Sequence, residues 1–565
     1  MVRMRDPCDL GFRGFDEMLR AVAEKHGTCV AFHEKKQGFY QHVSYGRLLE
    51  ECEALRLALG RLLPPTPRVL LVGENSYPWV LSFLSLLCGA GVPVLVDSGA
   101  SREEIAALAA RCDACAVLCD GAVKARVGEL SGVTVIDFEE LARLVAAGKA
   151  ALDAGELAPR EVCDVVAPAV IFCEALRTGE GKCVALSRKS MLATLHALGE
   201  AKTVSERDIF LAVLPFSRAE ACMLGLLYPL SRGASVAFGE GAGSIMRNMR
   251  EIHPTCMVAV PYLAKRIYDK FWELVGTREA QVRRAVAVSD PVRPLSARQA
   301  LKERLLAAAR APFGGALRYM LVVGEPLSAV LSKGLRQIGI FAAQCYGMAE
   351  CAGVAAMTSP GCYRDGTVGR ALSCARLDIE EKQADGSGEI LVGGDGIMLG
   401  YEKNGAETAA VLHDGRYATG DMGRIDSDGF LHIIGKKKNC ILRADGTRIS
   451  PEEIEQLLMQ SPLVHEAAVV GVTNDTGDDI ETAAMILPDA ARAAEFGFGE
   501  GTGDALERAV YEWLCEINKI LPPAAEVLLF ALSDTPIPRD EAGRILRDEV
   551  AKRLEAARND GLMTR

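Results

Sequence analysis

The chain has 565 residues, of which 49% are hydrophobic and 25% are charged, and its formal net charge is −11 at pH 7. This composition is typical of a globular protein, and the length allows two to four domain-sized units. Nucleic acids and anionic membranes attract positive charge, so the acidic balance argues against a general binder of either, and we expect no nucleic-acid partner.

The longest uncharged segment, residues 79–96, is long enough to span a membrane. Gly89, Gly91 and Pro93 interrupt it, so we predict a buried helix that leads through a glycine turn into a buried strand. The first residues, MVRMRDPCDLGF, carry two arginines without an apolar core and do not indicate a signal peptide. We expect a cytoplasmic protein without a transmembrane segment; peripheral membrane contact, and a monomer or a homodimer, stay open.

The 18 cysteines are irregularly spaced, which predicts reduced thiols. Cys112, Cys115 and Cys119 form the one ligand-like group in the sequence. No histidine or second pair lies beside them, so we interpret them as small apolar residues at a helix end and in a strand rather than as zinc ligands.

Helical and apolar strand patterns alternate along the first two thirds of the chain. An amphipathic helix from residue 12 is followed by a two-strand entry at 28–33 and 38–42 and by a helix over 44–62. Further strands are predicted at 68–72, 92–96, 116–119, 167–172, 208–215, 234–238, 253–261, 317–323 and 341–344, with helices at 103–111 and 190–198 among those between them. This alternation predicts parallel sheets with right-handed crossovers.

The pattern changes after residue 366. Short strands with Gly and Asp turns over 366–434 predict a small β-barrel. The last part predicts a helix from 452, strands at 465–472 and 482–487, a helix over 505–520 and a strand at 527–532. We therefore predict an α/β fold with a large N-terminal domain, 1–435, of α/β sheets plus the barrel, and a smaller mobile α+β C-terminal domain, 436–565.

A polar stretch separates these two predicted domains. It opens with Tyr417-Ala-Thr-Gly-Asp421, which we predict to be a short polar turn that ends in a carboxylate. Asp426-Ser-Asp-Gly429 carries the Asp-Gly signal of a hairpin between two half-buried strands. Gly435-Lys-Lys-Lys-Asn439 is a charged break that we interpret as the joint, and Ser450 and Pro451 indicate the N-cap and first residue of a helix.

Two further motifs follow predicted strands, where α/β sheets bind their ligands. They are Gly324-Glu-Pro326 and Tyr346-Gly-Met-Ala-Glu350. Together with the stretch around Asp421, in this order, they resemble the adenylate-forming (AMP-binding) superfamily of acyl-CoA synthetases, peptide-synthetase adenylation domains and luciferases. Within it the chain is most similar to bacterial long-chain fatty-acid–CoA ligases, from about residue 12 to residue 547.

The resemblance implies a reaction in two steps. A carboxylate, expected to be a fatty acid, attacks the α-phosphorus of ATP bound with Mg²⁺ and gives an acyl-adenylate and pyrophosphate. The C-terminal domain then rotates about Lys438, and a thiol, expected to be coenzyme A rather than a carrier-protein thiol, displaces AMP. Catalysis of this kind consists mostly of positioning and charge neutralisation.

The resemblance also implies roles for the nucleotide residues. Asp421 accepts hydrogen bonds from the two ribose hydroxyls, a charge-assisted contact. Gly324 and Glu325 line the purine, and Tyr346, followed by Gly347, stacks its ring on adenine. Glu350 is the expected Mg²⁺ ligand and catalytic carboxylate, because Mg²⁺ takes one or two carboxylates together with substrate phosphates.

The expected phosphate loop matches the family only in part. It reads Glu174-Ala-Leu-Arg-Thr-Gly-Glu-Gly-Lys-Cys183, in which Thr178, Gly179 and Lys182 agree with the family and Leu176 stands where the family has a glycine. Glycine there permits positive φ and close approach of backbone N–H groups to phosphate, and leucine makes the same geometry sterically costly.

Three other positions depart from the family. Arg218 replaces the histidine beside the acyl pocket, Lys436 replaces an arginine, and Arg544 replaces the lysine that bridges carboxylate and α-phosphate. Arginine and lysine do not substitute freely at such contacts. We take Lys182, Lys436, Arg448 and Arg544 as the candidates for phosphate charge, and Gly446 as the residue that pantetheine passes.

These departures leave an alternative open. Neutral drift explains any single one, but together they favour a relative that binds nucleotide or acyl groups without efficient ligation. The matches at Asp421 and Glu350 favour the ligase. A luciferase-like or carrier-protein-loading enzyme is a further alternative, and no carrier domain follows residue 547, which disfavours a multidomain peptide synthetase.

Overall fold

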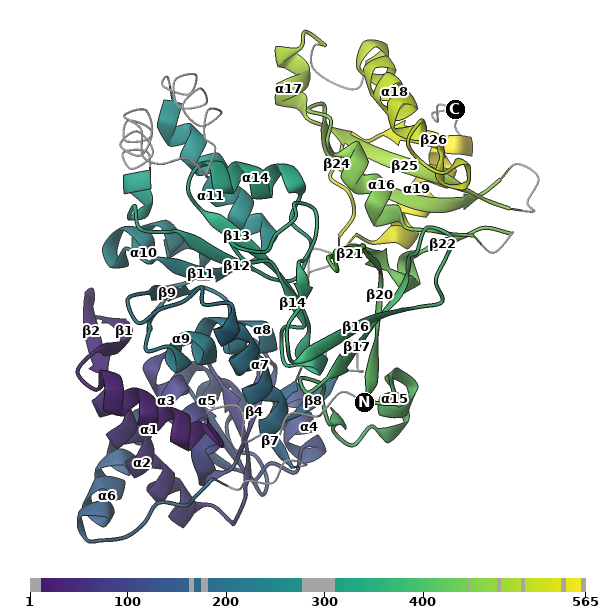
Figure 1. The fold of residues 1–565 in the computed structure, drawn as a ribbon. Helices are drawn as coiled ribbons and strands as arrows, with labels where there is room; N and C mark the ends of the chain where they lie inside the picture. Colours follow the sequence, from purple (N-terminus) through teal and green to yellow (C-terminus); the bar gives the residue numbers. More distant parts are fainter. Residues whose placement is uncertain are drawn as a thin grey trace. The chain divides into compact units, whose positions relative to one another are not determined.

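The computed structural model describes residues 12–161, 167–173, 181–276, 310–444, 447–474, 479–498, 503–539 and 545–559. The chain divides into two compact units, coloured along the sequence in Figure 1. The first holds Met1–Asp378, Leu391–Thr419 and Ile425–His432, and the second holds Ile379–Ile390, Gly420–Arg424 and Ile433–Arg565. The predicted domain boundary at 435/436 divides a large domain from a mobile one, and it stays a prediction.

The first unit contains a seven-stranded sheet in the order β18-β8-β7-β4-β3-β5-β6. Its strands are β3 (Arg68–Val72), β4 (Val92–Val96), β5 (Ala116–Cys119), β6 (Thr134–Asp137), β7 (Pro168–Cys173), β8 (Cys183–Ser187) and β18 (Gly400–Tyr401). From β7 to β6 the neighbours are parallel, whereas β8 runs antiparallel to both β7 and β18. The almost fully buried strands β3 and β5 agree with a parallel sheet covered on both faces.

A nine-stranded sheet has the order β15-β14-β13-β12-β11-β9-β10-β1-β2. Its strands are β1 (Val30–Lys36), β2 (Phe39–Ser44), β9 (Ile209–Ala212), β10 (Ser235–Phe238), β11 (Cys256–Ala259), β12 (Tyr319–Val322), β13 (Phe341–Tyr346), β14 (Ala356–Met357) and β15 (Arg370–Ala371). The stretch from β1 to β13 is parallel, and antiparallel pairs close both edges. The predicted α/β class with parallel sheets is confirmed.

Helices connect and cover these strands (Figure 1). They are α1 (Phe15–His26), α2 (Tyr45–Leu62), α3 (Tyr77–Ser85), α4 (Arg102–Arg111), α5 (Gly121–Val127), α6 (Leu141–Asp153), α7 (Arg188–Glu200), α8 (Ala219–Cys222), α9 (Tyr228–Ser231), α10 (Ile245–Ile252), α11 (Pro261–Val275), α14 (Ala329–Gln337) and α15 (Gly405–Val411). The uncharged segment 79–96 forms α3, a π-helical turn at Leu86–Ala90 and β4, as predicted, with Trp79 fully inside the core. Among the described residues, no helix combines the length and apolarity that crossing a bilayer requires.

The region predicted as a small barrel supplies a five-stranded sheet. Its strands are β16 (Ala375–Glu380), β17 (Gly388–Gly394), β19 (Leu412–His413), β20 (Arg416–Ile425) and β21 (Leu431–Lys436). The predicted Asp-Gly turn precedes β21: Gly429 has φ +82°, and Asp426 accepts hydrogen bonds from the backbone N–H of Asp428 and Phe430, both at 3.0 Å.

The second unit is built on a three-stranded sheet of β24 (Val464–Thr473), β25 (Ile480–Pro488) and β26 (Val527–Leu532). Its other elements are β22 (Ile441–Leu442), β23 (Arg448–Ile449), α16 (Pro451–Leu458), α17 (Ala490–Glu495), α18 (Asp504–Asn518) and α19 (Arg547–Asn559). Ser450 lies at the N-cap of α16, as predicted, but its hydroxyl donates to the carbonyl of Ile434 at 2.9 Å instead of capping the helix.

A buried ion pair joins two elements of this unit. Arg547 Nη1 in α19 lies 2.6 Å from Glu455 Oε1 in α16, and the same nitrogen donates to the Val469 carbonyl of β24 at 2.7 Å. Burial outweighs the attraction of Arg547 and raises the pKa of Glu455. The contact therefore fixes α19 against α16 and β24, and removing one partner would leave the other charge buried.

Candidate functional site

The ends of the parallel strands β12 and β13 hold the predicted purine residues. Gly324 follows β12 with φ +93°, a conformation that favours glycine, and Glu325 beside it is exposed. Gly347 follows β13, and a Cβ there would meet the carbonyl oxygen of Gly353 at 2.4 Å. Tyr346 is 7% exposed. The two motifs thus lie at the carboxyl edge of adjacent strands, where the sequence predicted a ligand site.

Glu350 lies in a buried polar network. It is 6% exposed, in the 3-10 turn Ala349–Cys351, and its Oε1 accepts a hydrogen bond from the Tyr401 hydroxyl at 2.8 Å. Tyr417 makes side-chain hydrogen bonds with Tyr401 and Glu350 as well. Burial and the charge of Glu350 raise the pKa of Tyr401 to about 12, so Tyr401 stays a neutral hydrogen-bond donor at physiological pH.

Lys182 reaches the same network from the residue before β8. Its Nζ donates to the Tyr401 hydroxyl at 3.2 Å, lies 4.8 Å from the centre of that ring and is 3.1 Å from Glu407 Oε1. Burial lowers the pKa of Lys182, but the hydrogen bonds to Tyr401 and Glu407 outweigh it, and the pKa is raised. The Tyr401 hydroxyl accepts from Lys182 and donates to Glu350, so it connects two predicted catalytic residues.

The sequence analysis missed Tyr401, Tyr417 and Glu407 as members of this network. Tyr401 belongs to a two-residue strand that pairs with β8, and it lies 219 positions from Lys182 in sequence. Tyr417 was noted only as the first residue of its motif. A pairing between a two-residue strand and β8 leaves no periodic signal, so no pattern in the sequence brings Tyr401 to Lys182.

Glu220 is another missed carboxylate. Burial and the negative charge of Glu350 raise its pKa, although Arg218 opposes the shift from 3.9 Å away. Arg218, the residue in place of the family histidine, has a side chain that is 56% exposed. The raised pKa of Glu220 therefore reports mainly the burial of this carboxylate, with a smaller contribution from the charge of Glu350.

Asp421 lies in the second unit, and the backbone before it differs from the predicted turn. We predicted Tyr417–Asp421 to be a turn, but these residues belong to the ten-residue strand β20. The glycine signal reflects a local distortion: Gly420 has φ +69°, and its N–H donates to the Glu389 side chain at 3.0 Å. Asp421 is 4% exposed and forms an ion pair with Lys436.

Arg448, a predicted cation of this unit, also has a carboxylate partner, as does Lys437, which was not among the predicted site residues. Arg448 Nη1 lies 2.7 Å from Glu381, and Lys437 Nζ lies 2.5 Å from Glu389. Lys438 is exposed in the 3-10 turn Lys437–Asn439, at the predicted joint. The structure thus brings Lys436 to Asp421 and holds Arg448 at Glu381. Thr178, Gly179, Gly446 and Arg544 lie outside the described residues.

Comparison with protein families gives a direct match. The family model described as AMP-binding enzyme matches residues 19–402, which is more than half of the chain. The chain belongs to the AMP-binding enzyme family. The matched region includes Lys182, Glu350 and Tyr401 of the buried network and the motifs that follow β12 and β13. The resemblance stated from the sequence motifs is confirmed.

Curated relatives of the chain are named as ligases. The chain is 27% identical over 517 residues to long-chain-fatty-acid–CoA ligase ACSBG1 of Bos taurus, which covers 83% of this chain and 70% of the relative. It is 25% identical over 473 residues to long-chain-fatty-acid–CoA ligase FadD15 of Mycobacterium bovis, with 78% and 77% covered. Members of this family activate acids with ATP, so the enzyme class of acid–thiol ligases follows for this chain.

Solved structures share the fold over nearly the whole chain. O-succinylbenzoate coenzyme A synthetase of Bacillus subtilis, in complex with AMP, gives a TM-score of 0.69 at 18% identity, with 94% of this chain and 97% of that chain covered. Apo MatB of Rhodopseudomonas palustris gives a TM-score of 0.72 at 20% identity, with 96% and 99% covered. At these identities the likeness establishes the adenylate-forming fold.

Proposed function

We propose that this chain joins a fatty acid to coenzyme A through an acyl-adenylate formed from ATP. The observation that carries the proposal is the network in which Lys182 and the buried Glu350, four residues after β13, share the Tyr401 hydroxyl. A cation and a carboxylate held by one hydroxyl provide the positioning and charge neutralisation that phosphate chemistry needs. The names of the curated relatives support the fatty acid and coenzyme A as substrates.

Each predicted residue has a role in this proposal. Asp421 binds the ribose, with Lys436 exchanging its carboxylate partner for phosphate when ATP enters. Lys438 is the hinge for the second step, and Gly446 is the residue that pantetheine passes. The purine site consists of Gly324, Glu325, Tyr346 and Gly347. The phosphate contacts come from Thr178, Gly179, Lys182, Arg448 and Arg544.

The residues around Glu350 fit a magnesium ion. Mg²⁺ takes one or two carboxylates together with substrate phosphates, and Glu350 offers a buried carboxylate that Tyr401 holds through one oxygen. Glu350 would hold the ion, which neutralises phosphate charge when bound. A cytoplasmic location and a monomeric or homodimeric state stay predictions.

The altered phosphate loop supports a second candidate function. Leu176 and Arg544 replace the glycine and lysine of the family pattern, and losing one preorganised transition-state contact costs about 3–4 kcal/mol. A relative that binds ATP or acyl groups without ligation would carry such changes. The network favours the ligase, because a binding protein has no need of a lysine and a buried glutamate joined by one hydroxyl.

Product analysis separates the two candidates. The full chain is incubated with ATP, MgCl₂, coenzyme A and saturated fatty acids of increasing chain length, and acyl-CoA and AMP are measured by mass spectrometry. We expect acyl-CoA and AMP in equal amounts with at least one acid. Measurable ATP binding without either product, across the series, would support the binding protein.

Arg544 gives a test at a single residue. If it is a weakened replacement for the family lysine, Arg544→Lys raises the rate of AMP formation, because an ammonium group bridges carboxylate and phosphate as a point charge. Lys519→Arg is the matched control. Lys519 lies directly after α18 at an exposed position and pairs with Glu516 of that helix. An unchanged or lower rate in Arg544→Lys would show that Arg544 has a different role.

A further inference from the structure

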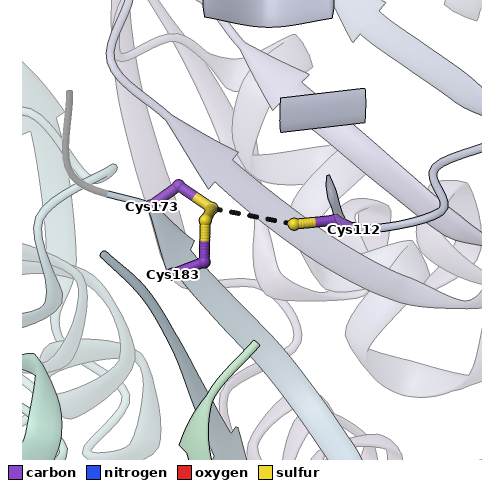
Figure 2. Close-up of side chains that lie close together, drawn as sticks. All are labelled: Cys112, Cys173 and Cys183. Atoms are coloured by element: carbon purple, nitrogen blue, oxygen red, sulfur yellow. Dashed lines mark hydrogen bonds between the residues drawn. A yellow bond between two sulfur atoms is a disulfide. The ribbon is translucent and has the colours of Figure 1, made fainter. Parts of the chain in front are cut away.

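Three buried cysteines from separate elements meet at one point of the seven-stranded sheet (Figure 2). Cys173 ends β7 and Cys183 begins β8, and the two form a disulfide. Cys112, directly after α4, points at them with its Sγ 4.0 Å from Cys173 Sγ. This corrects one expectation, because these thiols are not all reduced. The sequence showed Cys112 in a group with Cys115 and Cys119, whereas in the described part of the fold it lies with Cys173 and Cys183.

The backbone holds Cys173 and Cys183 together in either redox state. They are direct partners in the antiparallel pair β7–β8, and their Cα atoms are 4.1 Å apart. This is close to the spacing of a non-hydrogen-bonded pair, in which side chains approach each other most closely. Bond formation between the two sulfurs therefore needs no rearrangement of the strands.

The third sulfur is also fixed in place. The backbone N–H of Cys112 donates to Leu108 at the end of α4, and its carbonyl accepts from Arg68, which in turn pairs with Glu402 at 2.7 Å. Cys112 and Cys183 are fully buried, and Cys173 is 6% exposed. Cys173 is thus the only one of the three that a small solute contacts, and it touches both of the others.

The surroundings favour a disulfide over a metal centre. The three sulfurs lie within 4.8 Å of one another, a spacing that suits metal ligands too. However, they belong to an apolar cluster with Val94 and Ile171, where thiolates are costly and a disulfide is neutral. Burial raises the pKa of Cys112 to about 11, so this sulfur is a thiol at neutral pH.

We propose that Cys112, Cys173 and Cys183 form a thiol–disulfide site that a peroxide oxidises at Cys173. The oxidised state is a Cys173–Cys183 bond, which closes a covalent ring around residues 174–182, and Cys112 is the thiol that exchanges into it. Disulfides in cytoplasmic proteins are usually transient and redox-sensing, which agrees with a site that opens and closes.

The chemistry balances in two steps. The Cys173 thiolate attacks one peroxide oxygen, which gives a sulfenic acid and releases hydroxide that takes up the proton of the thiol as water. The Cys183 sulfur then attacks the Cys173 sulfur, forms the S–S bond and releases a second water. Two thiols and one hydrogen peroxide thus give one disulfide and two waters. In the exchange, the Cys112 sulfur attacks Cys173 Sγ as the thiol gives up its proton, and that proton goes to the released Cys183 sulfur.

The consequence for activity rests on the proposed function. The ring contains Thr178, Gly179 and Lys182, which we assign to phosphate. A covalent link between two ends of any chain segment restrains the residues between them, and a restraint of this kind lowers the entropy lost on binding. We expect the oxidised enzyme to have a KM for ATP about threefold or more below that of the reduced enzyme, with the KM for the acid unchanged.

Disulfide mapping tests the site itself. The full chain is reduced, freed of reductant, treated with hydrogen peroxide, alkylated and digested, and fragment spectra locate the linked sulfurs. We expect the Cys173–Cys183 link with Cys112 alkylated. Cys173 and Cys183 both recovered in alkylated form, a link to a cysteine outside the three, or zinc retained by the reduced protein would overturn the proposal.

Two variants and one control test Cys112. Cys183→Ala should shift the link to Cys112–Cys173, and Cys183→Ser repeats this test with a side chain of closer size. Cys119→Ser, in the same apolar cluster, should leave the wild-type link unchanged. Thermal unfolding followed by circular dichroism verifies that each variant folds. Absence of the Cys112–Cys173 link in both folded variants would exclude exchange through Cys112.

The disulfide mapping and the KM for ATP test different claims, so one can be contradicted without the other. If the link forms but the KM for ATP is the same in both redox states, the effect on ATP is wrong while the site stands. If no acid is activated in either state, the proposed function fails, and the mapping still decides the thiol site.

Discussion

Two groups of predicted site residues differ in how the fold holds them. In the first unit, Lys182 and Glu350 meet at the Tyr401 hydroxyl, and Glu350 is 6% exposed. In the second unit, Asp421 pairs with Lys436 and Arg448 pairs with Glu381, and each pair has one partner whose side chain is more than half exposed, at 54% and 52%. In the first group one hydroxyl links a buried carboxylate to a lysine whose side chain is 33% exposed, and the second group consists of ion pairs that each have one partner open to water.

This difference assigns different roles to the two groups: the first positions the reacting groups, and the second binds ATP. Polar groups in a buried network polarise one another and lose little mobility when a substrate arrives. Exposed ion pairs contribute about 0–1 kcal/mol to folding, so a ligand exchanges for one partner at small cost. We infer that the buried network sets the rate of acid activation, and that the exposed pairs set how ATP is bound and released.

Glu350→Gln should give the largest effect. The amide keeps the shape and still accepts from Tyr401, but it removes the negative charge that we assign to magnesium. We expect acid-dependent AMP formation to fall about 100-fold or more, the usual cost of one preorganised electrostatic contact. Magnesium titrations of both enzymes measure this. A variant with wild-type activity at every magnesium concentration would contradict the assignment.

Asp421→Asn tests the exposed group at its one buried member. Hydrogen bonds to a charged acceptor contribute about 1.5–3 kcal/mol, so we expect the KM for ATP to rise about 10- to 100-fold. The maximal rate should change less than in Glu350→Gln. Kinetics at varied ATP give both constants. A fall in rate with an unchanged KM would place Asp421 with the buried network and break the comparison.

Tyr401→Phe tests whether the hydroxyl that joins Lys182 and Glu350 matters. Removing the hydroxyl leaves Glu350 Oε1, a buried acceptor, with one hydrogen bond fewer. This loss lowers the free energy of unfolding by about 1–3 kcal/mol. We expect the maximal rate to fall about tenfold, in line with a loss of about 1.4 kcal/mol, while the KM for the acid is unchanged.

A structural role alone would lower the stability of Tyr401→Phe without coupling it to catalysis. Lys182→Gln combined with Tyr401→Phe separates the two cases. If Tyr401 positions Lys182, the double variant loses less activity than the product of the single losses, because neighbouring side chains that act together are not additive. Strict additivity would show that Tyr401 acts independently of Lys182.

Glu381→Gln should have the smallest effect. The carboxylate pairs with Arg448 at an exposed position, so its loss should change the free energy of unfolding by less than about 1 kcal/mol. Activity should stay within about twofold of wild type, and it should rise slightly if Arg448 is freed for phosphate. Urea unfolding gives the first value. A larger destabilisation would show that this pair resembles the buried network.

Much of the fold was predictable because its signals are local. The strands over 68–72, 92–96 and 116–119 agree residue for residue with β3, β4 and β5, since buried parallel strands appear as short apolar runs between helical patterns. Ser450 was placed correctly at a helix start, but its hydroxyl bonds to Ile434, an acceptor that only the folded chain brings near.

The site was predictable only where a motif names its residue. Glu350 and Asp421 stand in such motifs, whereas Tyr401 reaches Lys182 through the pairing of β18 with β8. The turn predicted at Tyr417–Asp421 was wrong, because a glycine with positive φ occurs here inside a strand. Cys112 was grouped with its neighbours in sequence, although the sheet brings it to Cys173.

Exchange of labelled pyrophosphate into ATP, in the presence of one carboxylic acid at a time and without coenzyme A, tests the central claim most directly. This reaction reports adenylate formation alone, before any thiol enters. We predict exchange that depends on a fatty acid and that Glu350→Gln lowers about 100-fold or more. Measurable ATP binding without exchange for any acid would contradict it and leave the chain as a nucleotide-binding relative of the ligases.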